Sequence, residues 1–231
     1  MDALPPARGF TNALAGATGL GVIAEVKRRS PSKGDLFADL DPGALAQSYQ
    51  AGGATCLSVL TDVEWFGGSP EDLAAARAAV TIPVLRKDFT VSETDVCDAR
   101  LMGADAVLLI AAALDDVELK AFHQLATELG LDPLVEIHDE AELERAMAVG
   151  ATLVGVNQRD LVTFQVDTDR AVRMAPLMPE GVVRVAESGV RGTDDASHLA
   201  DAGYHAVLVG ESLVTAGDPQ GAVAALRAIG A

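Results

Sequence analysis

Charged side chains interrupt several apolar segments of this chain, at positions where they could donate and accept protons. The first such segment reads Ile23-Ala-Glu-Val-Lys27, and its Glu25 and Lys27 stand two residues apart. Because alternate residues of a β-strand point to the same face, both side chains would project into the same space. Three later segments end in Leu85-Arg-Lys-Asp-Phe89, Leu134-Val-Glu-Ile-His138 and Val185-Ala-Glu-Ser-Gly189. Amines and carboxylates that converge on one cavity are suited to general acid–base catalysis.

These segments belong to a regular succession of short apolar runs, each followed by an alanine-rich stretch. The stretches 42–51, 71–80 and 140–149 have the spacing of amphipathic helices. The eight apolar runs are Val22–Val26, Thr55–Leu60, Pro83–Arg86, Ala106–Ile110, Pro133–Ile137, Leu153–Val156, Val182–Ala186 and Ala206–Val209. Strands that alternate with helices in this number predict an α/β fold, a closed (β/α)8 TIM barrel. Such a barrel carries its chemistry at the C-terminal ends of the strands, where the charged residues stand.

The length and the composition fit one domain of this kind. The chain has 231 residues, of which 49% are hydrophobic and only 4% aromatic. Barrels of this type typically need roughly 200 to 250 residues. We therefore predict a catalytic barrel over residues 22–231, preceded by a short N-terminal extension over residues 1–21. Within the extension we predict a short helix around Phe10–Ala15.

The charge and the cysteine content argue against several classes of function. With 17 Lys and Arg against 34 Asp and Glu, the formal net charge is −17, so no basic surface for nucleic acid or an anionic membrane is expected. The longest strongly apolar run, Ala106–Leu114, is too short to span a membrane, and no secretion signal is recognised. Cys56 and Cys97 lack the spacing of metal ligands and indicate structural thiols in a reducing, cytoplasmic location. We predict no metal site.

Seven polar residues at or just after the ends of the strands are the candidates for a functional site. They are Glu25, Lys27, Lys87, Glu136, Asn157, Arg159 and Glu187. Because burying such groups without partners costs several kcal/mol each, their convergence favours a functional role over a purely structural one. Arg86 and Asp88 are interpreted as ordinary helix-facing or loop charges. His138 is the one histidine of four near the predicted mouth, and a structural role is favoured for it.

Two turns that contain glycine predict a phosphate site. Ser188-Gly189 and Gly210-Glu-Ser212 follow the last two strands, where this fold often binds phosphate through backbone N–H groups at a helix N-terminus. Glycine lets the backbone approach the phosphate oxygens closely. Glu211 would contribute its N–H there, with its carboxylate turned away.

The charged strand ends and their neighbours together resemble a known family. The stretch Ile23-Ala-Glu-Val-Lys-Arg-Arg-Ser-Pro-Ser-Lys-Gly34 is similar to the signature of the indole-3-glycerol-phosphate synthases of tryptophan biosynthesis. The similarity continues through Ser58-Val-Leu-Thr61, Phe66-Gly-Gly-Ser69, Leu85-Arg-Lys-Asp-Phe89, Val135-Glu-Ile-His138, Gly155-Val-Asn-Gln-Arg-Asp-Leu161, Ala186-Glu-Ser-Gly189 and Val209-Gly210. It covers most of the chain, and its motifs are highly specific.

The resemblance implies a carboxy-lyase that acts on 1-(2-carboxyphenylamino)-1-deoxyribulose 5-phosphate. The ring of this substrate closes, carbon dioxide and then water leave, and indole-3-glycerol phosphate forms, with no metal or organic cofactor. Among the matching residues, Lys87 resembles the general acid of ring closure, Lys27 the acid that assists dehydration and Glu136 the general base. Glu25 and Glu187 resemble carboxylates that position the lysines and stabilise positive charge on the anilino nitrogen.

Further matching residues would bind the substrate. Asn157 and Arg159 resemble groups that orient it. The phosphate would lie near Ser30, Ser188, Gly189, Gly210 and Glu211, and the aromatic ring near the apolar walls Phe66, Phe89 and Leu109. Family members usually have a longer N-terminal extension, so residues 1–21 are expected to be a shortened cap over the barrel. We expect a small-molecule enzyme that is a monomer, or at most a weak dimer.

Three other functions remain open on the residues alone. A Schiff-base aldolase could use Lys87 or Lys27 as its nucleophile, although the many carboxylates argue against it. A catalytically silent barrel could bind a phosphosugar or join a complex. A phosphoribosylanthranilate isomerase would need a Cys and an Asp as acid and base, and Cys56, in the second strand, does not fit that pattern.

Overall fold

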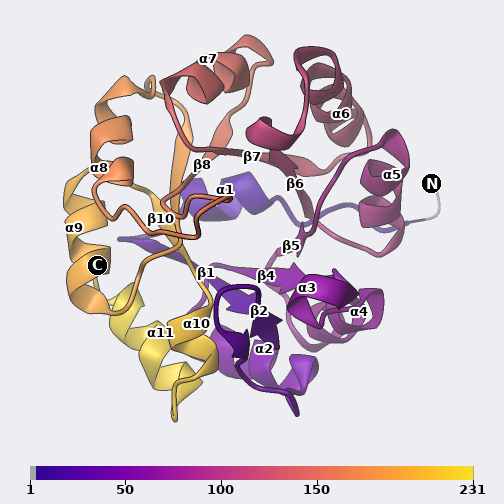
Figure 1. Cartoon of the computed structure of the whole chain (residues 1–231). Coiled ribbons are helices and arrows are strands. Elements are labelled where there is room, and N and C mark those ends of the chain that lie inside the picture. Colours follow the sequence, from indigo (N-terminus) through magenta and orange to yellow (C-terminus); the bar gives the residue numbers. More distant parts are fainter. Residues whose placement is uncertain (1–3, 231) are drawn as a thin grey trace.

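Eight parallel strands close into a barrel in the computed structural model, which describes residues 4–230 (Figure 1). The strands are β1 (Gly21–Val26), β4 (Cys56–Leu60), β5 (Val84–Lys87), β6 (Ala106–Ile110), β7 (Asp132–Ile137), β8 (Leu153–Asn157), β9 (Val183–Glu187) and β10 (Ala206–Val209). Each pairs with the next, and β10 pairs with β1 to complete the ring. The predicted (β/α)8 barrel is confirmed, and each predicted strand agrees with the observed bounds to within one residue.

Helices surround the barrel, as Figure 1 shows. They are α2 (Pro42–Ala51), α3 (Val63–Phe66), α4 (Pro70–Ala79), α5 (Glu93–Leu101), α6 (Asp116–Glu128), α7 (Glu140–Ala148), α8 (Arg170–Met174), α9 (Thr193–Asp201), α10 (Glu211–Val214) and α11 (Pro219–Arg227). Two short strands, β2 (Arg29–Ser30) and β3 (Gly34–Asp35), pair in the loop after β1. Within residues 4–230, no helix has the length and apolarity that crossing a membrane requires.

Local sequence fixes where most of the long helices begin. Asp41, Ser69, Ser92, Asp139 and Asp218 each precede a helix, and each side chain accepts a backbone N–H from the first turn of that helix. These bonds satisfy N–H groups that have no partner within the helix, which typically stabilises a helix by about 1 kcal/mol. The caps also set the lengths of the loops that carry residues to the mouth.

The strands separate two hydrophobic cores. Side chains that point inward fill the barrel, among them Ile23, Leu85 and Leu134. The alternate residues, such as Val22 and Val135, pack against the helices. This alternation follows from the two-residue repeat of a strand. The polar residues at the strand ends that share the inward parity therefore lie above the barrel core.

The extension before β1 closes the end of the barrel opposite the mouth. Its helix α1 (Phe10–Ala15) has the predicted bounds, and Phe10 and Leu14 are fully buried against the inward core. The backbone N–H of Thr11 donates to Asp132 Oδ2 over 2.9 Å, at the first residue of β7. The helix of the expected cap therefore covers the N-terminal ends of the strands.

Candidate active site

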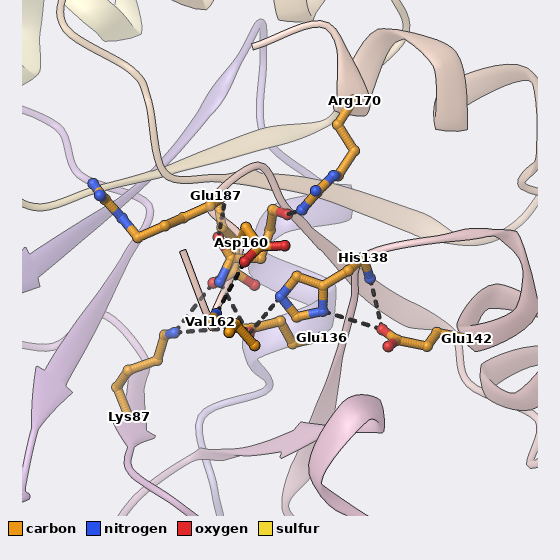
Figure 2. Close-up of polar contacts among 10 residues, drawn as sticks. Lys87, Glu136, His138, Glu142, Asp160, Val162, Arg170 and Glu187 are labelled. Atoms are coloured by element: carbon orange, nitrogen blue, oxygen red, sulfur yellow. Dashed lines mark hydrogen bonds and ion pairs between the residues drawn. The ribbon is translucent and has the colours of Figure 1, made fainter. Parts of the chain in front are cut away.

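Register brings polar residues from distant parts of the chain to one level of the barrel mouth. Lys87, Asn157 and Glu187 are the last residues of β5, β8 and β9. In the ladders, Asn157 lies beside Glu187, and Glu136 lies beside Ile110, the last residue of β6. The labelled side chains of Lys87, Glu136 and Glu187 point toward one another in Figure 2.

The amine of Lys87 lies between two buried carboxylates. Its Nζ is 3.1 Å from Glu136 Oε2 and 3.2 Å from Glu187 Oε2. The side chains of the two glutamates are only 1% and 2% exposed, whereas that of Lys87 is 15% exposed. Oε1 of Glu187 is buried and has no hydrogen-bond partner. One amine is thus shared between two acids in a site that is nearly closed to water but open on the lysine side.

The shared amine gives the two glutamates different acidities. Burial lowers the pKa of Lys87, but Glu136, Glu187 and Glu25 outweigh it and hold that pKa above its ordinary value. Burial also raises the pKa of Glu136, yet the charge of Lys87 and a hydrogen bond from Asn157 outweigh it, so the pKa of Glu136 falls. For Glu187, burial and the charge of Glu136 raise the pKa to about 8. The site therefore contains an ionised carboxylate and a carboxyl that retains its proton near neutrality.

A second amine–carboxylate pair stands at the end of β1. Lys27 Nζ is 2.6 Å from Glu25 Oε1, and both side chains are largely buried. The shared face that the spacing predicted is therefore occupied by an ion pair. Gly210 lies against this pair, because a methyl group at that position would overlap with Glu25 Oε1. Glycine after β10 thus leaves room for the carboxylate of Glu25.

Asn157 links the carboxylate cluster to the loop that follows β8. Its Nδ2 donates to Glu136 Oε1 over 3.1 Å, and its Oδ1 accepts the N–H of Arg159 over 3.0 Å. The guanidinium of Arg159 donates to the carbonyl of Phe164 within the same loop, over 3.1 Å. Arg170, which the sequence reasoning missed, donates to the carbonyl of Asn157 over 2.8 Å. Nothing in its local pattern distinguishes it from an ordinary helix charge.

The turn after β9 has an unusual backbone conformation. Ser188 has a φ of 66° and Gly189 a φ of 79°, two successive left-handed residues. Such a conformation costs a non-glycine residue energy and points successive N–H groups to one side. In the loop after β1, the hydroxyl of Ser30 is buried without a partner. The carboxylate of Glu211 lies 3.6 Å from Lys33 Nζ, on the loop after β1.

The apolar candidates divide into two groups. Phe89 is 47% exposed in the loop after β5, and Phe66 is half-buried at the end of α3, which follows β4. Leu109, in contrast, is fully buried in the core between the strands and the helices. The expectation that Leu109 lines the mouth is therefore wrong, because its side chain has the outward parity of β6. Ile110, the next residue, belongs to the inward core and is 7% exposed at the end of the strand.

His138 lies beside the cluster, directly after β7. Its Nδ1 is 3.1 Å from Glu142 Oε2, and its Nε2 faces Glu136 Oε1 at 3.8 Å (Figure 2). Arg86 and Asp88 pair with each other over 3.0 Å, as expected of local charges. Among residues 4–230, no three His, Cys, Asp or Glu side chains gather in a way that could hold a metal ion.

Comparisons with known proteins agree with the geometry of the mouth. The family model described as indole-3-glycerol phosphate synthase matches residues 1–226. An indole-3-glycerol phosphate synthase from a Nocardioides species is 59% identical over 207 residues, which are 90% of this chain and 80% of that protein. Another, from Streptomyces griseus, is 54% identical over 227 residues, or 98% of this chain and 84% of that protein.

A solved structure is similar in fold alone. Thiamine phosphate pyrophosphorylase from Pyrococcus furiosus superposes with a TM-score of 0.68, covering 91% of this chain and 95% of that one. Its sequence is only 16% identical. The superposition supports the barrel and carries no information on the reaction.

Proposed function

The chain belongs to the indole-3-glycerol phosphate synthase family, and we propose a division of the reaction among the side chains of the barrel mouth. The enzyme closes the ring of 1-(2-carboxyphenylamino)-1-deoxyribulose 5-phosphate and releases carbon dioxide and water, giving indole-3-glycerol phosphate in tryptophan biosynthesis. The chemistry needs an acid at the carbonyl oxygen, an acid at the departing hydroxyl and a base for the proton that is lost.

Lys87 is the acid of ring closure. As the aromatic carbon attacks the sugar carbonyl, the carbonyl oxygen develops negative charge and takes a proton from Lys87 Nζ. The raised pKa of Lys87 keeps the amine charged before the attack, and the developing alkoxide is basic enough to remove the proton. Before ring closure, the same positive charge pairs with the substrate carboxylate and orients it. Glu187, on the other side of the amine, positions Lys87, and the carboxylate of Glu25 stabilises the positive charge on the anilino nitrogen. Glu187 adds to this stabilisation once it gives up its proton.

Lys27 and Glu136 serve the loss of water. Lys27 protonates the hydroxyl that leaves, and Glu136 accepts the proton lost from the carbon next to the nitrogen, which completes the aromatic indole. The two lysines together give up two protons and Glu136 recovers one. The contact of 3.1 Å between Glu136 and Lys87 offers a direct return for that proton. The other must come from solvent, because loss of carbon dioxide from a carboxylate consumes one proton.

The remaining candidates bind the substrate. The phosphate would be surrounded by the left-handed residues Ser188 and Gly189 together with Gly210 and the N–H of Glu211. The hydroxyl of Ser30, which has no partner, would also bind it. Phe66, Phe89 and Ile110 would contact the aromatic ring. Asn157 orients Glu136, whereas Arg159 would have to leave its contact with Phe164 to reach the substrate.

The observation that carries this proposal is the amine of Lys87 held between Glu136 and Glu187. Steady-state turnover, followed by the fluorescence of the indole product, tests it. Lys87→Ala and Glu136→Gln are each expected to lower kcat by about 10²- to 10⁴-fold, the usual cost of removing a positioned acid or base. Lys120→Ala and Glu144→Gln, at exposed positions on α6 and α7, are the matched controls and should retain wild-type turnover.

The outcome separates the competing functions. Full activity in either Lys87→Ala or Glu136→Gln would remove that residue from the mechanism. A folded wild type without turnover would favour a silent phosphosugar-binding barrel. Covalent trapping of a carbonyl substrate on Lys87 or Lys27 by borohydride would favour Schiff-base chemistry.

The proposal extends to the partners, the location and the oligomeric state of the enzyme. The net charge of −17 supports an enzyme of small molecules without a nucleic-acid partner. We place it in the cytoplasm as a monomer, or at most a weak dimer. Light scattering over a range of concentrations tests the monomer.

A further inference from the structure

His138 holds a buried nitrogen without a hydrogen bond at the edge of the site. Its Nε2 has no partner and faces Glu136 Oε1 at 3.8 Å. Buried polar groups normally have a partner, so an orphaned ring nitrogen beside a functional carboxylate calls for an explanation. Neither the ring closure nor the dehydration described above uses it.

The other side of the imidazole ring is fixed by Glu142. Oε2 of Glu142 lies 3.1 Å from Nδ1 of His138 and also accepts the backbone N–H of His138 over 2.7 Å. A carboxylate accepts hydrogen bonds only, so Nδ1 carries a proton. Glu142 in the first turn of α7 thus sets both the orientation of the ring and its tautomer. Nε2 is thereby directed at Glu136.

The charges around the ring favour its protonated form while Glu136 is ionised. In the neutral ring, the lone pair of Nε2 would face the negative Oε1 of Glu136. In the imidazolium, Nε2–H would face it instead and attract it. Three charged groups act on the ring. Glu136 on β7 and Glu142 on α7 favour the imidazolium, and Arg170 on α8 disfavours it. Burial lowers the pKa of His138, but the two glutamates outweigh it and the pKa is raised.

We propose that His138 is a positioning residue for Glu136, whose imidazolium, oriented by Glu142, keeps the carboxylate of Glu136 ionised and aimed at Lys87. Oε1 of Glu136 then has Asn157 and His138 as neighbours, while Oε2 has Lys87. Three side chains therefore hold the carboxylate of Glu136, and its Oε2 points at the amine of Lys87. This inference rests on the proposed role of Glu136 as the general base.

A purely structural histidine would give different results. In that case the ring only covers the end of β7. An uncharged side chain of similar shape should then replace it without shifting the pH dependence of kcat. If the imidazolium stabilises ionised Glu136, removing the positive charge raises the pKa of Glu136. Activity that requires ionised Glu136 would then begin at a higher pH. The acid limb of the kcat profile distinguishes the two cases.

The test compares His138→Asn with His123→Asn, which makes the same change on α6, in the helix layer. We expect His138→Asn to lower kcat by about tenfold near neutral pH with KM changed less than about twofold. The midpoint of its acid limb should move up by about one pH unit. His123→Asn should match the wild type in both. Added imidazole should restore part of the kcat of His138→Ala, which a failure to fold would prevent.

The double variant Glu136→Gln/His138→Asn separates failure of this inference from failure of the proposed function. If His138 acts through Glu136, the double variant is no slower than Glu136→Gln alone. An unchanged acid limb and kcat in His138→Asn overturns the role of His138 while leaving Glu136 as the base. Wild-type activity in Glu136→Gln overturns both, and the Glu136 variant alone reveals it.

Discussion

Gly155 on β8 lies so close to Glu187 on β9 that a methyl group at position 155 would overlap with the carboxylate oxygen Oε1. The same methyl group would lie 3.3 Å from Leu134 Cδ1, within the inward core. Gly155 has the inward parity of β8 and stands beside Glu136 in the ladder. The absence of a side chain at this position therefore provides the space in which Glu187 reaches Lys87.

Gly155→Ala should consequently displace Glu187 from Lys87. We expect kcat to fall by at least about tenfold, because the charges around the amine change, and the free energy of unfolding to fall by about 1–3 kcal/mol, as in other overpacked cores. Kinetics and urea denaturation measure the two effects. Gly192→Ala is the control, since nothing lies within 4 Å of its added methyl group. Wild-type kcat in Gly155→Ala would show that Glu187 can move without consequence.

The raised pKa of Glu187 predicts how stability depends on pH. Burial, together with the charge of Glu136, raises this pKa from 4.5 to about 8. Between these two pH values the folded protein retains a proton that the unfolded chain releases, so its stability falls as pH rises through this window. Glu187→Gln has no such proton to lose. Its free energy of unfolding, measured by urea at pH 5 to 9, should decline less steeply than that of the wild type.

Exposed Glu144 on α7 supplies the control for this comparison. Glu144→Gln removes one negative charge at a solvated position, and its stability curve should run parallel to that of the wild type. Parallel curves for wild type and Glu187→Gln would mean that Glu187 is already ionised in the folded protein at acid pH.

The sequence predicted the barrel and the residues of its mouth because both depend on short-range patterns. The two-residue repeat identified the strands and placed Glu25 and Lys27 on one face, where they form an ion pair. Motif resemblance supplied the family. The short-range patterns do not specify how far one strand is shifted relative to the next. They therefore could not predict that Glu136 and Glu187 share Lys87.

The errors have physical causes of the same kind. Leu109 was expected at the mouth although its neighbours Leu108 and Ile110 have the inward parity, and a shift of one residue reverses the face of a strand. The short helix Phe10–Ala15 was placed correctly along the chain, but its docking at the N-terminal end depends on long-range contacts with residues such as Asp132. The expectation that Arg159 orients the substrate stays a prediction, and its bond to Phe164 depends on a loop conformation that no pattern specified.

The parity of β6 makes Leu109 and Ile110 a matched pair of variants. Leu109→Ala should lower the free energy of unfolding by about 2–5 kcal/mol, the usual cost of a cavity in a buried core, and leave KM unchanged. Ile110→Ala should raise KM several-fold, because its side chain points inward at the C-terminal end of the strand. It should cost less stability than Leu109→Ala, because Ile110 is 7% exposed whereas Leu109 is fully buried. Substrate titration and thermal unfolding measure both variants. A rise of KM in Leu109→Ala alone would restore the original expectation.

Because Ser188 has a left-handed conformation, its effect on protein stability can be separated from its effect on substrate binding. A φ of 66° typically costs a non-glycine residue about 1 kcal/mol, and glycine removes that cost. Ser188→Gly should therefore be more stable than the wild type by about 1 kcal/mol, in urea unfolding, if the turn keeps its shape. Its KM should nevertheless rise, because the hydroxyl is lost and the N–H groups that face the phosphate are no longer held in place. Ser188→Ala retains the restriction on φ and loses only the hydroxyl, so the difference in KM between the two variants measures the value of the fixed backbone. Equal KM values in Ser188→Gly and the wild type would exclude Ser188 from the phosphate site.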